Sequence, residues 1–323
     1  MSDVISPTQR QLTPHDVAAL LKERFERTVV HCGPLSGGTF AAVWRVTLDD
    51  GTEAVVKVGP PPGCRLLRYE LGIIAAEARY YRLVRQHAPG VPVPPVLHAD
   101  DDVVVVGLLP GRPLTELPEG TDAGGVRTQL GAALRKLHTV TGTAFGYDGG
   151  GRAGGATWRE AFASMTAGLL ADARDWGVEL PAGDDDILAT IERHADALDE
   201  VQRPALVHFD LWDGNVLCQD GVFTGLVDGE RYFWGDPLYD FVCTAIGHRL
   251  EDERDHPVLR GYHGGTAPVF TGSERTRLAL YRVQFHLLLL AEMPSRAMVG
   301  EVARERRAWV TPLLEHDLET LRG

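Results

Sequence analysis

The chain is poor in cysteine, and its few cysteines lie far apart. Among its 323 residues there are four, Cys32, Cys64, Cys218 and Cys243, and no two of them form a C-x-x-C pair. Zinc sites require closely spaced ligands, and small secreted domains require dense disulfides, so neither class is expected. Scattered cysteines of this kind are typical of reduced thiols in a cytoplasmic protein.

Positive charge is also scarce. Lys and Arg number 32 against 45 Asp and Glu, which gives a formal net charge of -13. A nucleic-acid partner is therefore not expected, because phosphate contacts require a basic surface. The excess of acidic residues has two interpretations that the sequence leaves open: it attracts a cationic ligand, or it keeps the protein soluble.

Long apolar runs and several common motifs are missing as well. The apolar run at residues 287–291 is far too short to cross a bilayer, so no membrane partner is expected. Residues 13–16, Thr-Pro-His-Asp, predict a capped helix start and not a signal peptide, which favours a cytoplasmic location. No Walker A motif, H-E-x-x-H or dinucleotide fingerprint is present.

The chain divides into two regions of different character. The first has β-rich segments at residues 39–48 and 54–58 around a turn at 49–51, a helix at 66–86 and a strand at 102–107. Beyond it, short strands are expected at 206–207 and 217–227, and helices at 128–138, 158–172, 184–201, 274–291 and 297–321, the last broken at Pro312. This order predicts an α+β, bilobal fold, with a small sheet-rich N-terminal lobe at 1–107 and a larger, mostly helical C-terminal lobe at 108–323.

Residues 208–215, His-Phe-Asp-Leu-Trp-Asp-Gly-Asn, carry the strongest chemical signal. Their His, Asp and Asn spacing reproduces the H-R-D-x-x-x-x-N loop of protein kinases. In such a loop Asp210 can orient and deprotonate an attacking hydroxyl, and Asn215 offers an amide oxygen to magnesium. Asp228 follows a predicted strand in the segment Leu-Val-Asp-Gly-Glu, as a second magnesium ligand should.

Two N-terminal segments support the same chemistry. Residues 36–43 match the template G-x-G-x-x-G-x-V only at Gly38 and Val43. Residues 54–57, Ala-Val-Val-Lys, are similar to the V-A-I-K strand of kinases. Taken alone, residues 36–43 could be an ordinary turn, and Lys57 could be a solvated lysine at a strand edge. Because both segments precede the kinase-like loop in the expected order, their position favours a role for Lys57.

Taken together, these segments resemble the aminoglycoside phosphotransferases and their relatives, including the choline, homoserine, macrolide and fructosamine kinases. The resemblance rests on residues 208–215, 227–230 and 235–240, and residues 134–138 are similar to the family's L-x-x-L-H helix. In weaker form it extends over nearly the whole chain. It implies a protein-kinase-like fold and a kinase that uses ATP and Mg²⁺ to phosphorylate a small-molecule hydroxyl.

The resemblance also implies roles for individual residues. Lys57 would contact the α- and β-phosphates and be held by an acidic residue of the following helix. Glu77 is preferred to Glu70, because its neighbours and the prolines after the helix fit the family better. The nucleotide would lie against the glycine-containing loop and the connection between the lobes, at Ser36, Gly37, Gly38, Val105, Gly107 and Leu109.

The acceptor side carries weaker signals. Candidate substrate contacts are Asp213, Glu230 and Trp212, with His286 and Glu292 further along the chain. A solvated turn or a neighbouring ion pair is the alternative interpretation for the acidic ones. His208 is expected to support the shape of the loop, while Asp236 and Asp240 are expected to brace it.

Phe209 departs from the related families. It replaces the arginine of H-R-D, which argues against a protein kinase controlled by phosphorylation, and many antibiotic kinases resemble H-G-D here. The acceptor expected first is an aminoglycoside-type antibiotic, whose ammonium groups could pair with acidic residues of the C-terminal helices. A sugar amine, a macrolide, a nucleoside antibiotic, choline and homoserine stay open. So does a kinase-like binding protein without catalysis.

Overall fold

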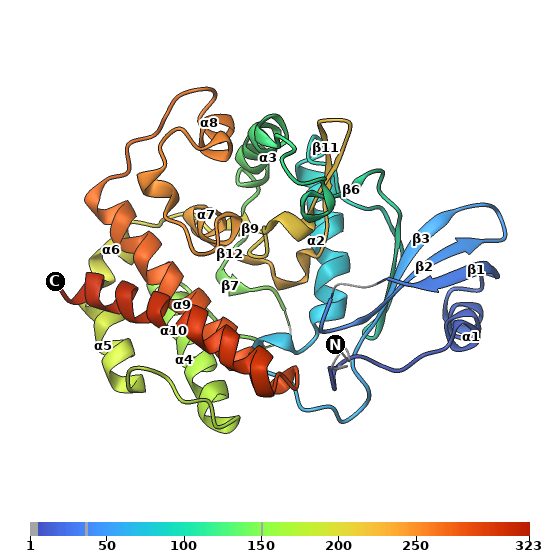
Figure 1. The fold of residues 1–323 in the computed structure, drawn as a ribbon, viewed down its shortest axis with the longest axis horizontal. Helices are drawn as coiled ribbons and strands as arrows, with labels where there is room; N and C mark the ends of the chain where they lie inside the picture. The colour runs from blue at the N-terminus through green and yellow to red at the C-terminus, as the bar shows by residue number, and fades with distance from the viewer. Residues whose placement is uncertain (1–5, 36–37, 150) are drawn as a thin grey trace.

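The protein has a sheet-rich lobe and a helical lobe (Figure 1); the computed structural model describes residues 6–35, 38–149 and 151–323. The smaller lobe contains a five-stranded sheet with the order β1-β2-β3-β5-β4, in which all neighbours are antiparallel. Its strands are β1 (Val29–Pro34), β2 (Ala42–Leu48), β3 (Glu53–Val58), β4 (Val96–Ala99) and β5 (Val103–Gly107). β5 ends at Gly107, the residue after which the sequence analysis placed the boundary between the two lobes. That this boundary separates two domains stays a prediction.

Helices cover both faces of this sheet. On one face lies α1 (Pro14–Arg24), which begins at the expected capping box of Thr13 and Asp16. On the other lies α2 (Ile73–His87). The four consecutive valines of β5 alternate between the two faces, because Val103 and Val105 pack with the α1 side and Val104 and Val106 with the α2 side. The sheet is therefore buried on both faces, as a run of valines predicts.

The expected helix at 66–86 begins later than predicted. Gly72 has φ 69°, in the left-handed region, so the helix starts only at Ile73, and Arg68–Glu70 form a separate 3-10 turn. Glycine adopts this conformation without the steric cost that a Cβ carries. The break lets residues 64–70 leave the helix axis and reach the C-terminal lobe, where the Arg68 guanidinium pairs with Asp172 at 2.5 Å.

The β2–β3 hairpin places Lys57. These strands pair around the turn at residues 49–51, as predicted, and Lys57 lies opposite Val43 in β2 and Val104 in β5. Residues directly opposite one another on adjacent strands share a face of the sheet. Lys57 therefore shares the face of Val104, which packs toward α2, and its side chain is buried there.

The larger lobe consists mainly of helices (Figure 1). They are α3 (Gly124–Leu137), α4 (Trp158–Asp175), α5 (Asp184–Arg193), α6 (Ala195–Asp199), α7 (Leu238–Thr244), α8 (Pro257–Tyr262), α9 (Gly272–Ser295) and α10 (Gly300–Arg322). From Arg277 onward nearly all of α9 is buried, since the helix packs against α4, α7 and α10. Over the described residues, no helix combines the length and the apolar character needed to span a bilayer.

The larger lobe also contains two small sheets. One has the order β11-β10-β6 and the other β8-β7-β12-β9. Their strands are β6 (Arg112–Pro113), β7 (Phe145–Tyr147), β8 (Gly154–Gly155), β9 (Ala205–Val207), β10 (Val216–Gln219), β11 (Val222–Leu226) and β12 (Phe233–Gly235). The kinase-like loop connects β9 to β10, and Asp228 follows β11, so both chemical segments leave strand ends.

Three sequence expectations for this lobe were wrong. The expected strand at 217–227 is a hairpin, because Asp220 and Gly221 both adopt positive φ, at 50° and 75°. The expected helix at 184–201 is divided at His194, where the backbone is no longer helical. The Nε2 of this residue lies at hydrogen-bond distance, 2.7 Å, from the Leu321 carbonyl oxygen. Pro312 does not break α10, since the exposed proline lies inside a helix whose other face is held by buried leucines.

Phe209, in the loop after β9, has an unusual backbone conformation. Its φ is 74°, in the left-handed region that residues with a Cβ avoid. The ring is buried among Phe233, Tyr239 and Phe285, at centroid distances of 5.6, 5.3 and 6.0 Å. Packing of this ring therefore holds a side chain at a position whose backbone suits glycine.

This conflict predicts an inverted order of stability for two variants. Phe209→Ala and Phe209→Gly both lose the packed ring, at a cost of about 3–5 kcal/mol. Only the alanine retains the left-handed strain, so we expect Phe209→Gly to be more stable by about 0.5–1 kcal/mol, measured from urea unfolding.

A matched pair at Phe233 serves as the control. This residue is buried in β12, where glycine weakens a strand by about 0.5–1 kcal/mol relative to alanine. Phe233→Gly should therefore be less stable than Phe233→Ala. If both pairs showed this ordinary order, strain at Phe209 would be disproved.

Candidate active site

A buried carboxylate holds the loop that carries Asp210. Asp240 of α7 is fully buried and accepts hydrogen bonds from the backbone N–H groups of His208, at 3.1 Å, and Phe209, at 2.8 Å. The ring Nε2 of His138, at the end of α3, lies 2.9 Å from the same carboxylate. Asp240 thus braces the loop directly and connects it to the L-x-x-L-H helix. Asp236 instead holds the turn before α7, where it accepts hydrogen bonds from Arg277 and Tyr281.

His208 supports the loop through both ring nitrogens. Nδ1 accepts the backbone N–H of Asp210 at 3.3 Å, so Nε2 carries the hydrogen and donates to the Val227 carbonyl at 3.1 Å. Burial lowers the pKa of this imidazole. A neutral ring with both nitrogens engaged cannot serve as a base, and it ties the loop to the segment that carries Asp228.

Asp210 and Asn215 lie at the two ends of the same loop. The Asn215 side-chain amide donates to the Asp210 backbone carbonyl at 2.8 Å, which directs its nitrogen inward and leaves its oxygen for another partner. Burial raises the pKa of Asp210 to about 6, although the nearby Arg231 guanidinium opposes the shift. Such a carboxylate is ionised at neutral pH yet basic enough to accept a proton.

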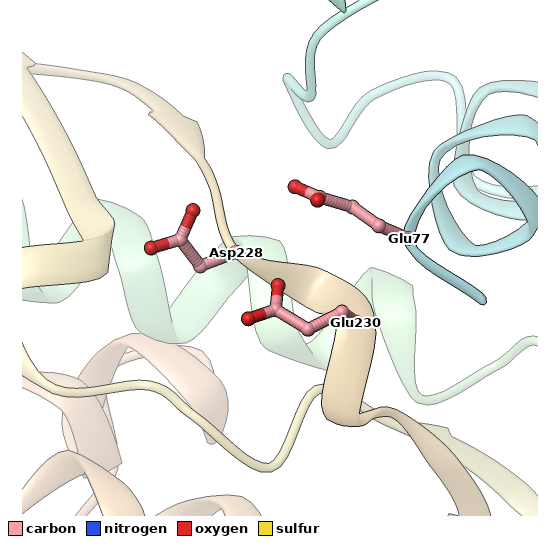
Figure 2. Close-up of side chains that lie close together, drawn as sticks. All are labelled: Glu77, Asp228 and Glu230. Carbon is pink, nitrogen blue, oxygen red and sulfur yellow. The ribbon is translucent and has the colours of Figure 1, made fainter. Parts of the chain in front are cut away.

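Lys57 lies among three carboxylates. Its Nζ is 2.6 Å from Glu77 Oε1, 2.6 Å from Asp228 Oδ1 and 3.6 Å from Glu230 Oε2. Figure 2 shows Glu77 on α2 facing Asp228 and Glu230, which come from one segment of the other lobe. Burial alone would lower the pKa of Lys57, but the three carboxylates outweigh it and raise the pKa well above its ordinary value.

The structure distinguishes the two acidic residues considered as partners of Lys57. Glu77 contacts Lys57 directly and also accepts the Tyr81 hydroxyl at 2.7 Å. Glu70 lies apart from this cluster, buried in an ion pair with Arg296 at the end of α9. The later start of α2 explains this, since Glu70 belongs to the turn before Gly72 and does not share a helix with Glu77.

The residues around Lys57 fit a magnesium ion. Glu77, Asp228 and Glu230 each offer an oxygen, and these atoms lie within 4.8 Å of one another. Glu77 Oε2 and Glu230 Oε2 are buried and have no hydrogen-bond partner among the residues that the structure describes. Magnesium prefers oxygen ligands, so unpartnered carboxylate oxygens beside Asp228 suit it. Glu230 thus lies on the Lys57 side of the site and not with the other substrate candidates.

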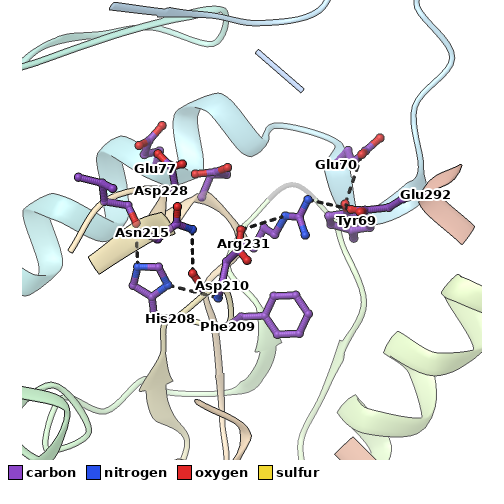
Figure 3. Close-up of polar contacts among 12 residues, drawn as sticks. Tyr69, Glu70, Glu77, His208, Phe209, Asp210, Asn215, Asp228, Arg231 and Glu292 are labelled. Carbon is purple, nitrogen blue, oxygen red and sulfur yellow. Dashed lines mark hydrogen bonds and ion pairs between the residues drawn. The ribbon is translucent and has the colours of Figure 1, made fainter. Parts of the chain in front are cut away.

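Arg231 is a residue that the sequence did not reveal. Its Nε lies 4.0 Å from Asp210 Oδ2, and its Nη2 lies 2.8 Å from Glu292 Oε1. Glu292 also accepts the Tyr69 hydroxyl. Figure 3 shows Asp210 between this chain of contacts and the group formed by Asn215, Asp228 and Glu77. The signal available in the sequence was a basic residue directly after Asp-Gly-Glu.

The remaining acceptor candidates are dispersed. Asp213 is ion-paired with Arg127 at 2.5 Å, and Trp212 is 42% exposed with its ring against Gly214. His286 is buried, with its Nδ1 3.5 Å from Asp317 Oδ2. Of these candidates, only Glu292 lies in the chain of contacts that reaches Asp210.

The expected adenine contacts are largely engaged within the sheet. Val105 pairs with both Val56 and His98, and the N–H of Gly107 donates to the Pro95 carbonyl at 2.9 Å. Leu109, just beyond β5, is therefore the better candidate for a backbone contact with a base. In the loop after β1, Gly38 is exposed, whereas Ser36 and Gly37 lie outside the described residues.

Solved structures of known proteins share this fold. One is the crystal structure of a putative fructosamine-3-kinase from Thermobifida fusca, with 25% identity, a TM-score of 0.66, and coverage of 94% of this chain and 98% of that chain. A second is a thermostable mutant of an aminoglycoside phosphotransferase in ternary complex with AMP-PNP and hygromycin B. It has 18% identity, a TM-score of 0.63, and coverage of 95% and 99%. A third is a macrolide 2'-phosphotransferase from Brachybacterium faecium, with 18% identity, a TM-score of 0.57, and coverage of 91% and 97%.

The family is established by a sequence match. No curated protein matches the chain. The model of the phosphotransferase enzyme family, APH, matches residues 31–280, which include both strands of the Lys57 hairpin, the kinase-like loop and Asp228. This match covers well over half of the chain, and it agrees with the phosphotransferase and kinase structures that share the fold. The chain therefore belongs to the phosphotransferase enzyme family.

Proposed function

We propose that the protein transfers the γ-phosphate of ATP to a hydroxyl group of a small molecule. The observation that carries this proposal is the position of Lys57, 2.6 Å from both Glu77 and Asp228, beside a loop that presents Asp210 and Asn215. A lysine held by a helix glutamate, together with a metal-binding aspartate, is the phosphate-binding arrangement of kinases. The AMP-PNP in the similar aminoglycoside phosphotransferase supports ATP as the donor.

Each residue then has a role in in-line transfer. The acceptor oxygen forms a bond to the γ-phosphorus while the bond to the β,γ-bridging oxygen breaks, and ADP leaves with the electron pair. Asp210 orients the acceptor hydroxyl and takes its proton. Asn215, Asp228 and Glu230 would hold Mg²⁺, which would neutralise negative charge on the phosphates. Lys57 binds the phosphates, and Glu77 keeps its ammonium group in place.

The acceptor class needs a separate argument. The sequence favours an aminoglycoside, and the similar structure with hygromycin B is consistent with a bulky small-molecule acceptor. Two buried carboxylates of the C-terminal helices are already paired, Glu292 through Oε1 with Arg231 and Asp317 with Arg249 at 2.7 Å. These two residues therefore do not favour a polycation over a sugar amine, a macrolide or another hydroxyl compound as the acceptor.

Replacement of Asp210 tests the catalytic assignment. Asp210→Ala should lower turnover by about 10²–10⁴, because it removes the group that takes the hydroxyl proton. The measurement is ADP formation, with a mass gain of one phosphoryl group on the acceptor, across a panel of sugar amines, hydroxy acids, macrolides, nucleosides and aminoglycosides. Stabilisation by Mg-ATP in thermal melting should be nearly unchanged.

Asp220→Asn is the matched control, since Asp220 is exposed in the β10–β11 turn and should tolerate the change. Near-normal turnover in Asp210→Ala would refute the assigned role. Binding of Mg-ATP without any product would instead favour a kinase-like binding protein.

The raised pKa of Asp210 predicts a pH dependence. Protonation removes the base, and burial raises its pKa to about 6, so kcat/KM for the acceptor should fall about tenfold per pH unit below about 6. The profile is measured at saturating Mg-ATP between pH 4.5 and 8, over which the fold must be shown to be intact. A constant rate down to pH 4.5 would show that Asp210 is not the titrating base.

A further inference from the structure

The N-terminal segment at residues 6–11 lies across the loop that leads into β2. The Gln9 side chain donates from Nε2 to the backbone carbonyls of Gly38, at 2.7 Å, and Ala41, at 3.2 Å. Because a carbonyl oxygen only accepts hydrogen bonds, the NH2 group of the amide, with its two hydrogens, must face these two carbonyls. One side chain therefore bridges the two ends of the loop at 38–41.

The residues on either side of this glutamine fix the segment in place. Thr8 is fully buried, and its hydroxyl donates to the Thr39 carbonyl of the same loop at 3.0 Å. On the other side, the Arg10 guanidinium donates to the Pro60 carbonyl at 2.9 Å and pairs with Asp102 at 2.5 Å. These contacts anchor the segment to the loop on one side and to the ends of β3 and β5 on the other.

The direction of the loop carbonyls determines where its N–H groups point. In a planar trans peptide the C=O of one residue and the N–H of the next point in opposite directions. Because the Gly38 and Thr39 carbonyls face the N-terminal segment, the N–H groups of Thr39 and Phe40 point away from it. Among the residues that the structure describes, none accepts a hydrogen bond from either N–H group. Two adjacent backbone donors are therefore available to a ligand.

This loop lies next to Lys57 in the sheet. It enters β2 at Ala42, the neighbour of Val43, which lies opposite Lys57 in β3. In kinases the loop at this position covers the nucleotide phosphates, and successive backbone N–H groups form a concavity that binds anions. The segment at residues 6–11 precedes residues 31–280, which match the family model, so that match assigns it no role.

We propose that this N-terminal segment is part of the nucleotide site, where Gln9 and Thr8 hold the loop at 38–41 in the conformation that binds the phosphates of ATP. The proposal rests on the proposed function and extends its site to a segment ahead of the first strand. It makes Gln9 and Thr8 positioning residues, since they act through the loop. A loop that is held before ATP arrives binds it more tightly, because apparent affinity falls with the fraction of molecules in the competent conformation.

Replacement of Gln9 tests the proposal. Gln9→Met nearly keeps the length of the side chain and removes both donors, so a smaller fraction of molecules should have the binding conformation. We expect the Kd for Mg-AMP-PNP and the KM for ATP to rise about fivefold or more. At saturating Mg-ATP the bound nucleotide itself holds the loop, so kcat should stay within about twofold of the wild type. Binding is measured by isothermal titration calorimetry on the full chain, and turnover by ADP formation.

Two comparisons separate positioning of the loop from general stability. Gln11→Met is the matched control, because the Gln11 amide contacts the Gln9 carbonyl, at 3.4 Å, and no described residue of the loop. Its Kd should equal that of the wild type. At the second position, Thr8→Ser keeps the hydroxyl and Thr8→Val keeps the shape, so the serine variant should bind Mg-AMP-PNP more tightly than the valine variant. This pair also serves if Gln9→Met does not fold, which thermal melting without ligand reveals.

An unchanged Kd in Gln9→Met, with or without a lower melting temperature, would overturn the proposal and leave the proposed function standing. An equal rise of Kd in Gln11→Met would overturn it as well, since that residue does not hold the loop. If the wild type binds Mg-AMP-PNP but phosphorylates none of the acceptors tested, the calorimetric comparison alone decides. Absence of Mg-AMP-PNP binding in the wild type would refute both this proposal and ATP as the phosphate donor.

Discussion

The charge balance around Lys57 is the constraint on which the site depends. One ammonium group faces Glu77, Asp228 and Glu230, so two negative charges are in excess when all three carboxylates are ionised. Burying uncompensated charge is expensive, and burial raises the pKa of Glu77 to about 7. A divalent cation would supply the missing charge, and the unpartnered oxygens of Glu77 and Glu230 are consistent with this. The cluster also joins the lobes, since Lys57 and Glu77 belong to one and Asp228 to the other.

A second buried charge, that of Asp240, holds the loop at 208–215 beside this cluster. Asp240 accepts two consecutive backbone N–H groups at the start of the loop, and His208 fastens the loop to the Val227 carbonyl. Phe209, whose N–H donates to Asp240, has a left-handed backbone conformation that is unfavourable for a residue with a bulky side chain. The aromatic cluster around Phe209 therefore compensates for strain that a glycine would not carry. This shows how a chain can depart from H-G-D and keep the geometry of the loop.

The sequence predicted the features that depend on local spacing. The Lys57 hairpin, the loop at 208–215 and the segment with Asp228 are short, and each has its chemistry within a few residues, so their patterns could be read directly. The pairing of Lys57 with Glu77 was predicted correctly, since the helix and its proline exit follow in the sequence. The start of α2 was not, because a left-handed glycine at residue 72 is compatible with a helical pattern until φ is known.

Contacts between distant segments could not be predicted in this way. Glu70 and Arg296 are 226 residues apart, and Tyr69 and Glu292 are 223 apart, so no periodicity relates them. The continuation of α10 through Pro312 likewise depends on tertiary packing, which outweighs the local cost of a proline. In each case the deciding term is the burial of one segment against another, which composition and spacing do not contain.

The same limit applies to the charge of the expected acceptor. A net charge of -13 suggests a cationic ligand only if the acidic residues near the site are free, and net charge describes the long-range field, not a single pocket. Glu292 is paired with Arg231, which lies beside Asp210, and Glu70 is paired with Arg296, so part of the acidic charge of this region is already compensated. Exposed charges farther away than about 10 Å are largely screened by salt, whereas buried neighbours are screened much less. The pairing of individual side chains, and not the net charge, therefore determines which charge the acceptor meets.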